Sequence, residues 1–367
     1  MEDNLIPAAR PVTAYRDQPP ALIRATDDAS AVRIWLERYH RSPNTFRAYE
    51  REAHRFLGWA HMQGLAMGQI TVEDANNYLR WLANPPQGII GKKKRRGTDD
   101  WRPLNKPLSE KSLSHSRTIL ATLYRFMCDA NYLTGNPFAL VERIVVPKEP
   151  MERYLEKDLW QHLQDYLSDV LPTEPGVTQA HAERCGWIFT FLYHTGFRIS
   201  ELAGAKMGDF RQREGKWWLR VLGKGKKIDF VPVTDLLFVA LGRYRISQGL
   251  SPLPSFAEET PVVGRVSKPQ APVTAQAIHK VIKQVFARFG AHLESQGQAA
   301  LAQHVVRMSA HWMRHTTASH QLAEGVPFLH VSKNLRHGKP DTTMIYTHVE
   351  RDQRHDAMRG FGKKPTA

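Results

Sequence analysis

Cysteine is nearly absent from this chain of 367 residues, which contains only Cys128 and Cys185. Both stand among apolar residues in segments with a helical pattern, as buried thiols do. A disulfide framework is not indicated, because the small secreted domains that depend on one are rich in cysteine. We expect both thiols to be reduced, as they are in the cytoplasm.

The sequence also lacks a long hydrophobic run. The longest, around residues 187–193, is far shorter than the ~20 apolar residues that a membrane-spanning helix needs. The first residues, M-E-D-N-L-I-P-A-A-R, contain no apolar segment of the kind that a signal peptide requires. These absences predict a cytoplasmic protein with no membrane partner.

Acidic residues are too few to balance the basic ones. Lys and Arg number 51 against 36 Asp and Glu, so the formal net charge is +15. Both halves are basic: residues 1–150 carry 22 Lys and Arg against 16 Asp and Glu, and the remaining residues carry 29 against 20. A positive field over the whole chain favours a polyanionic partner such as a nucleic acid.

Reactive side chains are concentrated late in the sequence. The segment H-W-M-R-H-T-T-A-S-H begins at His311, and N-L-R-H-G-K-P-D-T-T-M-I-Y-T-H occupies residues 334–348. His311 and Arg314 are three residues apart, so on a helix they would share one face. Together with His337 and Tyr346 they supply two imidazoles, a guanidinium and a phenol, a set suited to attack on a phosphodiester.

Two simpler interpretations compete with this one. Each of these side chains, taken singly, could be a packed residue with one hydrogen bond. A zinc site is the second alternative, because His311 and His315 have the spacing of the H-E-x-x-H motif. Trp312 stands where that motif has glutamate, so the general base of a metalloprotease is missing. We therefore predict no bound metal.

Five pieces of sequence occur in a specific order. H-x-x-R at 311–314 is followed by L-x-H-G and by a tyrosine nine residues after that histidine, in the frame T-T-x-x-Y-T-H. Upstream lie T-G-F-R-I-S-E-L at 195–202 and G-K-G-K-K at 223–227. In this order the pieces resemble the signature of the tyrosine recombinases, also called the phage integrase family, over roughly residues 150–350.

This resemblance implies an enzyme that cuts and rejoins DNA at specific sites through a 3′-phosphotyrosine intermediate and a Holliday junction. The implied catalytic residues are Arg198, Lys224, His311, Arg314, His337 and Tyr346. Tyr346 would be the nucleophile, and Lys224 would protonate the leaving 5′ oxygen. Lys226 and Lys227 stand close enough to be alternatives for that lysine. No metal, cofactor or ATP is implied, because the covalent link stores the bond energy.

Two further positions bear on the geometry of this set. Glu201 matches an acidic family position that orients its neighbours rather than reacting itself. Arg336 departs from the family pattern, because it replaces the glycine of L-G-H. That replacement could reshape the turn or add a phosphate contact, but it removes no catalytic group.

We predict a mainly α-helical fold with a small β-hairpin or sheet, divided into two domains. Residues 1–27 are expected to form a flexible arm. By the resemblance, residues 28–145 form an all-α, SAM-like core-binding domain, and residues 146–367 form a mixed α/β tyrosine-recombinase catalytic domain with a C-terminal tail.

Periodicity and capping signals predict individual elements. An amphipathic helix is expected over residues 274–289, and strands at 216–222 and 228–233 should flank the lysine-rich turn. The Pro-rich residues 251–273 are expected to be irregular, and residues 290–308 have no functional interpretation.

Two groups of basic residues in the N-terminal half are candidates for contact with DNA phosphates. Arg47, Arg51 and Arg55 form a stripe along a helix predicted over residues 43–63. A loop at 84–108 contains five consecutive cations, Lys92, Lys93, Lys94, Arg95 and Arg96. Each group could instead be a solvated surface.

The resemblance implies double-stranded DNA recombination sites as the partner. Because members of the family act as tetramers on two duplexes, we expect a homo-tetramer on DNA, associated with the nucleoid. A partner recombinase or an accessory factor is compatible with this expectation. Residues 349–367 could dock on a neighbouring subunit or form a frayed terminus. Type IB topoisomerases share the chemistry, so DNA relaxation without strand exchange is the main functional alternative.

Overall fold

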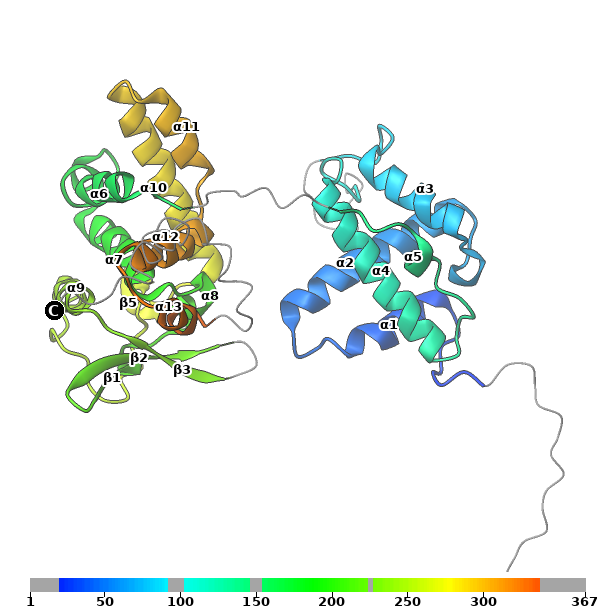
Figure 1. Cartoon of the computed structure of the whole chain (residues 1–367), viewed down its shortest axis with the longest axis horizontal. Coiled ribbons are helices and arrows are strands. Elements are labelled where there is room, and N and C mark those ends of the chain that lie inside the picture. Colours follow the sequence, from blue (N-terminus) through cyan, green and yellow to red (C-terminus); the bar gives the residue numbers. More distant parts are fainter. Residues whose placement is uncertain (1–19, 92–101, 146–153, 224–226, 337–367) are drawn as a thin grey trace, which may run out of the picture. The chain divides into compact units, whose positions relative to one another are not determined.

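The computed structural model of the chain describes residues 20–91, 102–145, 154–223 and 227–336. These residues fall into two compact units, and the boundary lies between Glu149 and Pro150. Figure 1 labels the helices of both units and most strands of the C-terminal unit.

The N-terminal unit is built from helices whose ends follow local sequence signals. Asp27 caps the first helix by accepting a hydrogen bond from the Ser30 main-chain N–H at 2.6 Å, and Thr71 caps the third from Asp74 in the same way. Pro43 occupies the first position of the second helix, where no main-chain donor is needed. The helices are α1 (Asp28–Glu37), α2 (Pro43–Met62), α3 (Val72–Ala83), α4 (Glu110–Asp129) and α5 (Pro137–Leu140), with a 3-10 turn at Met67–Gln69.

Aromatic side chains form the centre of the N-terminal unit. The Phe56 ring packs edge-on against Tyr78 and Phe138, with ring centroids 5.2 and 5.3 Å apart. The buried carboxylate of Glu52 accepts hydrogen bonds from the hydroxyls of Tyr78 and Ser116. Because a buried carboxylate needs such partners, this cluster ties α2 to α3 and α4.

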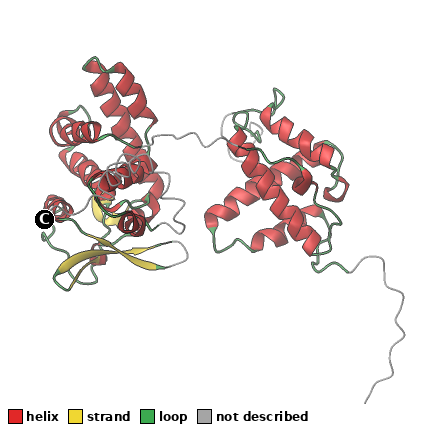
Figure 2. Cartoon of the chain, viewed as in Figure 1, coloured by secondary structure: helices red, strands yellow, loops and turns green. Residues whose placement is uncertain are grey.

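The C-terminal unit contains the strands drawn in Figure 2 and a larger set of helices. The helices are α6 (Lys157–Asp165), α7 (Gln179–Thr195), α8 (Ile199–Gly204), α9 (Asp235–Ser247), α10 (Ala275–Ser295), α11 (Ala299–Arg307), α12 (Ala310–Ala323) and α13 (Phe328–Asn334), with a π segment at Tyr166–Val170 and 3-10 turns at Leu171–Thr173 and Met207–Asp209. The central helix is α7, which buries Trp187, Phe189 and Phe191 and packs against α9, α10 and α12.

A three-stranded antiparallel sheet adjoins these helices. It consists of β1 (Phe210–Arg213), β2 (Lys216–Leu222) and β3 (Ile228–Pro232), in that order. Leu219 of β2 lies opposite Phe210 and Val231, and all three side chains are buried. The predicted hairpin of β2 and β3 is confirmed, and β1 extends it into a sheet.

The expectation that residues 251–273 are irregular is wrong for their last part. There, β4 (Gly264–Arg265) and β5 (Lys268–Pro272) form an antiparallel hairpin. Gly264 permits this pairing, since a Cβ at that position would overlap the main chain of Pro269. The sequence did not indicate these strands because proline is unusual within strands.

Residues 290–308 complete a helical hairpin. α10 continues to Ser295, beyond its predicted end at Phe289, and α11 packs back against it. Figure 1 shows the two helices side by side. Gly290 lies at their contact, where a Cβ would stand 2.8 Å from the Val306 side chain. Residues 290–308 therefore have a structural explanation, since they allow two helices to pack closely together.

The turn at the C-terminal end of α7 depends on Gly196. Its φ is 58°, in the left-handed region that glycine adopts without strain. A Cβ there would lie 2.5 Å from the Leu335 side chain and 3.4 Å from that of Thr317. Glycine therefore lets the chain reverse direction while it packs tightly against α12 and the end of α13.

Gly196→Ala is expected to lower the free energy of unfolding by about 2–5 kcal/mol, because alanine adds both left-handed strain and steric overlap. The matched control is Gly176→Ala, where φ is 75° and nothing lies within 4 Å of the added methyl group. The control should cost about 1–2 kcal/mol, from strain alone. Urea denaturation followed by circular dichroism measures both changes. Equal changes would show that overlap with Leu335 contributes nothing.

Candidate active site

Three of the predicted catalytic residues lie in the described part of the chain. They are Arg198, His311 and Arg314, all in the C-terminal unit. Outside the described residues lie Lys224, His337, Tyr346 and the basic run Lys92, Lys93, Lys94, Arg95 and Arg96. The geometry of the site is therefore built from the two arginines, His311 and their neighbours.

Arg314 is buried in α12, and its guanidinium binds the main chain at two distant places. The helix begins after Ser309, and the Arg314 residue is only 3% exposed. Nη1 donates to the carbonyl of Gly196 at the end of α7, and Nη2 donates to the carbonyl of Leu335 at the end of α13. A forked, permanently charged donor satisfies both carbonyls at once. Arg314 of α12 therefore holds the C-terminal ends of α7 and α13 together.

Arg198 stands immediately before α8. Its main-chain N–H donates to Glu201 Oε2 at 2.8 Å, and its Nη1 donates to Glu201 Oε1 at 2.9 Å. The Arg198 side chain nevertheless remains 46% exposed. Gly196, whose carbonyl Arg314 binds, lies only two residues before Arg198. The contact of Arg314 is therefore close in the chain to the half-exposed side chain of Arg198.

Glu201 is shared between Arg198 and Arg336. Its Oε2 also accepts a hydrogen bond from Arg336 Nη2 at 2.6 Å, and the side chains of Glu201 and Arg336 are each 6% exposed. Burial alone would raise the pKa of Glu201, but the charges and hydrogen bonds of Arg336 and Arg198 outweigh burial and lower it. The carboxylate is therefore ionised at neutral pH and restrains both arginines.

His311 is exposed, whereas Arg314 on the same helix is buried. Residues three apart differ by about 60° around a helix axis, which is enough to place one inside and the other at the surface. The His311 ring packs edge-on against His315, with centroids 4.4 Å apart. The predicted common helix is therefore present, but its two functional side chains lie on either side of the boundary between protein and solvent.

The sequence did not identify His320, which fixes the start of the C-terminal unit. Its Nε2 lies 2.8 Å from the Leu155 carbonyl, and its Nδ1 lies 2.9 Å from the Tyr193 hydroxyl. Because a carbonyl can only accept, Nε2 carries the proton and Nδ1 accepts from Tyr193. Thr316 Oγ1 accepts from the Leu155 N–H at 2.9 Å. Helical periodicity could assign His320 to the core but could not reveal this pairing.

The lysine-bearing hairpin is formed by β2 and β3. The Gly223 N–H donates to the Lys227 carbonyl at 2.8 Å, which closes the base of the turn. Lys227 is exposed, and Lys224 and Lys226 lie outside the described residues. β3 packs against α13, the helix whose C-terminal end Arg314 binds. The hairpin therefore packs against the same helix whose C-terminal end Arg314 binds.

The predicted arginine stripe of α2 is shorter than expected. Arg47 and Arg51 are exposed. Arg55 instead forms an ion pair with the buried Glu52, and its side chain is only 11% exposed. Because its charge is balanced by Glu52, Arg55 does not extend the exposed stripe of Arg47 and Arg51.

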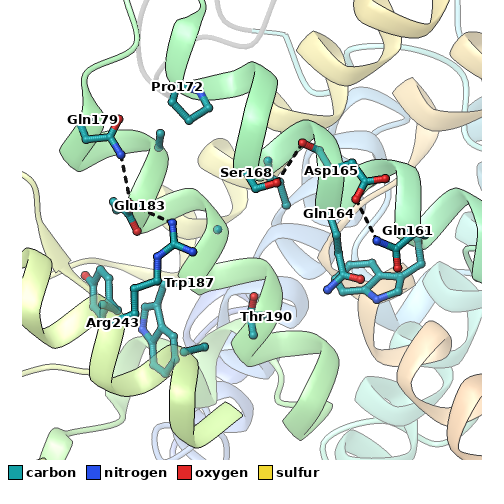
Figure 3. A pocket seen from close by; sticks show the side chains of 16 residues that line it. Gln161, Gln164, Asp165, Ser168, Pro172, Gln179, Glu183, Trp187, Thr190 and Arg243 are labelled. Carbon is teal, nitrogen blue, oxygen red and sulfur yellow. Dashed lines mark hydrogen bonds and ion pairs between the residues drawn. The ribbon is translucent and has the colours of Figure 1, made fainter. Parts of the chain in front are cut away.

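A surface cavity of about 370 Å³ is separate from these residues. Side chains from α6, α7 and α9 line it, as Figure 3 shows. Glu183 in this cavity accepts a hydrogen bond from Gln179 at 3.1 Å and pairs with Arg243 at 3.3 Å. None of the three described catalytic candidates lines it. The cavity is therefore no part of the candidate site.

Within the parts of the chain that the structure describes, no group of three or more His, Cys, Asp or Glu side chains could hold a metal ion. Within those parts, the pair of His311 and His315 therefore lacks the further ligands that zinc requires.

Among the described helices, none combines the length and the apolar character needed to cross a membrane.

Comparison with known proteins identifies the family. The model of the phage integrase family matches residues 155–353, which is more than half of the chain. The tyrosine recombinase XerC of Oceanobacillus iheyensis is 26% identical and covers 86% of this chain and 89% of its own length. The tyrosine recombinase XerD of Shewanella oneidensis is 27% identical, with coverages of 84% and 87%.

Solved structures share the fold. The XerH site-specific recombinase, bound to a palindromic difH substrate, matches with a TM-score of 0.62 at 15% identity over 93% of this chain and 86% of that chain. The Tn1549 transposon integrase, in complex with circular intermediate DNA, matches with a TM-score of 0.61 at 15% identity, with coverages of 91% and 99%. The predicted fold class, mainly helical with a small sheet, is confirmed.

The matching family and its relatives define a class of enzymes that break and rejoin DNA, the tyrosine recombinases. The chain belongs to the phage integrase family, and its activity is site-specific recombination. DNA relaxation in the manner of a type IB topoisomerase is not favoured, because the relatives are recombinases.

Three histidines of the C-terminal unit, of which His320 is buried and the other two are half-buried, predict a loss of stability below neutral pH. Burial lowers the pKa of His181, His194 and His320, so the folded protein favours the neutral rings. The unfolded chain, with ordinary values near 6.5, binds protons first as the pH falls. The stability from these residues is therefore complete above a pH of about 6.5 and declines progressively below it.

His320→Gln should lower the free energy of unfolding at pH 7.5, because it disturbs the hydrogen bonds to Leu155 and Tyr193. It should also weaken the pH dependence, because one titrating ring is gone. Urea denaturation at pH 7.5 and 5.5 tests both effects. The exposed His330, replaced by glutamine, is the control and should leave both unchanged. A drop between the two pH values that equals the wild-type drop would contradict the assignment to His320.

Proposed function

We propose that this enzyme recombines DNA by transferring a strand to Tyr346, through a 3′-phosphotyrosine intermediate and a Holliday junction. The observation that supports this most directly is the pair of hydrogen bonds donated by Arg314. They join the carbonyl of Gly196, two residues before Arg198, to the carbonyl of Leu335. Arg198 is thereby linked to the part of the chain that continues towards Tyr346.

The proposed chemistry must overcome two electrostatic costs. A tyrosine phenol has a pKa near 10, so forming the phenolate at pH 7 costs about 4 kcal/mol. The five-coordinate phosphate also gains negative charge, which forked arginine donors neutralise well. Loss of one such donor typically costs about 3–4 kcal/mol. One donor from Arg198, whose side chain is 46% exposed, would therefore offset most of the ionisation cost of Tyr346. The buried charge of Arg314, whose Nη1 and Nη2 already donate to main-chain carbonyls, would add to it.

Each remaining residue of the predicted set has a distinct role in this proposal. His311, exposed on α12, would bind the phosphate and accept the phenol proton. Lys224 would protonate the leaving 5′ oxygen, with Lys226 and Lys227 as alternatives. His337 would complete the phosphate site. The phosphotyrosine conserves the energy of the broken phosphodiester, so the proposal requires neither ATP nor a metal.

The two arginines call for different experiments. Arg314 is 3% exposed and satisfies two buried carbonyls. Its replacement by alanine would leave those carbonyls unpaired and would therefore lower stability as well as activity. The Arg198 side chain is 46% exposed, so its replacement reports on catalysis more directly.

Duplex DNA with recombination sites is the proposed substrate, and a homo-tetramer is the proposed assembly. The first part is supported by the net charge of +15 and by the solved complexes of XerH and the Tn1549 integrase with DNA. Residues 1–27 would be an arm, 28–145 the core-binding domain and 146–367 the catalytic domain, with a tail at 349–367 that contacts a neighbouring subunit. A partner recombinase or accessory factor and nucleoid association fit the same proposal.

Tyr346→Phe should bind DNA with wild-type affinity but form no covalent adduct, because phenylalanine lacks the attacking oxygen. The substrate is a duplex selected by binding to the purified protein and nicked so that the cleaved end diffuses away. Denaturing electrophoresis detects the adduct, and gel shift measures binding.

Tyr39→Phe makes the same chemical change in the N-terminal unit and should retain wild-type adduct formation. An adduct that persists in Tyr346→Phe would identify a different nucleophile. Joining of two partner sites by the wild-type enzyme separates recombination from relaxation of supercoiled DNA alone.

Neutralising Lys92, Lys93, Lys94, Arg95 and Arg96 together should weaken binding to all duplexes. The plot of log affinity against log salt concentration should become shallower by roughly 0.9 for each DNA phosphate that these side chains no longer bind. Replacing Lys92, Lys93 and Lys94 by arginine keeps the charge and should preserve the slope. If neutralisation left the slope unchanged, the run would be a solvated loop.

A further inference from the structure

Arg336 occupies a backbone conformation that favours glycine. Its φ is 55°, inside the left-handed region, at the position where the related motif L-G-H has glycine. A long side chain in this conformation is strained unless its contacts compensate, and such strain tends to cluster at functional sites. The question is therefore what the Arg336 side chain does that glycine cannot.

The Arg336 guanidinium is held on three sides. Nη2 donates to Glu201 Oε2 at 2.6 Å, and Nη1 donates to the Asn334 carbonyl at 2.7 Å. The planar group also lies over the Phe197 ring, 4.6 Å from its centroid, in a cation–π contact. Phe197 and Glu201 lie on either side of Arg198 in the sequence. Arg336 therefore holds the segment that contains Arg198 through contacts on both sides of that residue.

Glu201 connects Arg336 to Arg198, because its carboxylate accepts hydrogen bonds from both. The oxygen that accepts from Arg336 also accepts from the Arg198 main-chain N–H at 2.8 Å, and the other oxygen accepts from Arg198 Nη1 at 2.9 Å. One carboxylate thus fixes both the backbone and the side chain of Arg198. The Arg336 contact limits the positions that this carboxylate can take.

The balance of charge among Arg198, Glu201 and Arg336 also favours a role for Arg336 at the site. Glu201 alone beside Arg198 would form a neutral pair, which has little attraction for a phosphate. With Arg336 included, two guanidinium groups share one carboxylate, and these three side chains carry one net positive charge. Asp229 of β3 acts on Arg336 as a further and weaker negative charge. Because the Arg336 side chain is 6% exposed and that of Arg198 is 46% exposed, the surplus charge is presented to solvent through Arg198.

We propose that Arg336 is a positioning residue for strand cleavage, which acts through Glu201 to orient Arg198 and to keep the site positively charged. This inference rests on the proposed function, since it assigns Arg198 to the reacting phosphate. It explains why a strained arginine stands in place of glycine. Its distinguishing consequence is that the effect of Arg336 passes mainly through Glu201, the carboxylate that both arginines share.

The test uses Arg336→Gly in the full-length enzyme, because glycine tolerates a φ of 55° and removes only the side chain. Single-turnover cleavage of the nicked duplex should slow by about 10-fold or more at saturating DNA, while half-saturation changes less than about 3-fold. Arg336→Lys, which keeps the charge but lacks the fork, should recover part of the rate. Glu214→Gly makes the same backbone change at a φ of 49° in the β1–β2 turn and should cleave like the wild type.

Two readouts separate positioning from a general structural defect. In a double-mutant cycle, Arg336→Gly should add little to the reduction in rate caused by Glu201→Gln, because both remove one linkage. Removing Arg336 should also raise the pKa of Glu201, so cleavage should fall at a higher pH than in the wild type as the medium is acidified. Fully additive reductions, or an unchanged pH profile, would overturn the inference.

The outcomes also separate this inference from the proposed function. A wild-type adduct that Tyr346→Phe abolishes supports the proposed function independently of Arg336. If that result is obtained and Arg336→Gly cleaves at the wild-type rate, the inference about Arg336 fails and the proposed function stands. If the wild-type enzyme bound DNA but formed no adduct, both would fall. A thermal melt of Arg336→Gly and Arg336→Lys shows whether each variant is folded. The cleavage rate of a variant that is folded is then the test of the inference.

Discussion

The buried guanidinium of Arg314 is the interaction on which the rest of the site depends. It lies between the C-terminal carbonyls of α7 and α13, where helix dipoles place partial negative charge. Helix ends leave such carbonyls without intrahelical partners, and a buried one is costly unless a donor reaches it. One arginine supplies donors to both ends. The packing of both helix ends against α12 is therefore secured by the hydrogen bonds of one side chain.

Charge balance is the second constraint. Several guanidinium groups gathered for a phosphate would repel one another in the free enzyme, and Glu201 relieves that repulsion by pairing with Arg198 and Arg336. Its lowered pKa keeps it ionised where the enzyme works. A comparable balance stabilises the N-terminal unit, where Glu52 pairs with Arg55 inside the aromatic core. In both units a buried carboxylate balances the charge of a neighbouring arginine.

Much of the fold could be predicted from local signals. Regular apolar spacing indicated the helices predicted over residues 43–63 and 274–289, and alternation indicated β2 and β3. α9 was not predicted, because it is apolar on its exposed side as well, with Leu236 70% and Val239 69% exposed, so no periodicity appears. The short strand β1 was missed because its sequence, F-R-Q-R, is mostly charged and polar.

The sequence by itself determined the family, the reactive side chains and their order, because those depend on residue type and spacing within short motifs. Tertiary structure alone decided which of these side chains are buried and which pair with one another. Arg314 reaches a carbonyl 118 residues away, and Arg336 reaches a carboxylate 135 residues away. Burial and ion pairing arise between segments far apart in the chain, so their outcome depends on packing that no local pattern encodes.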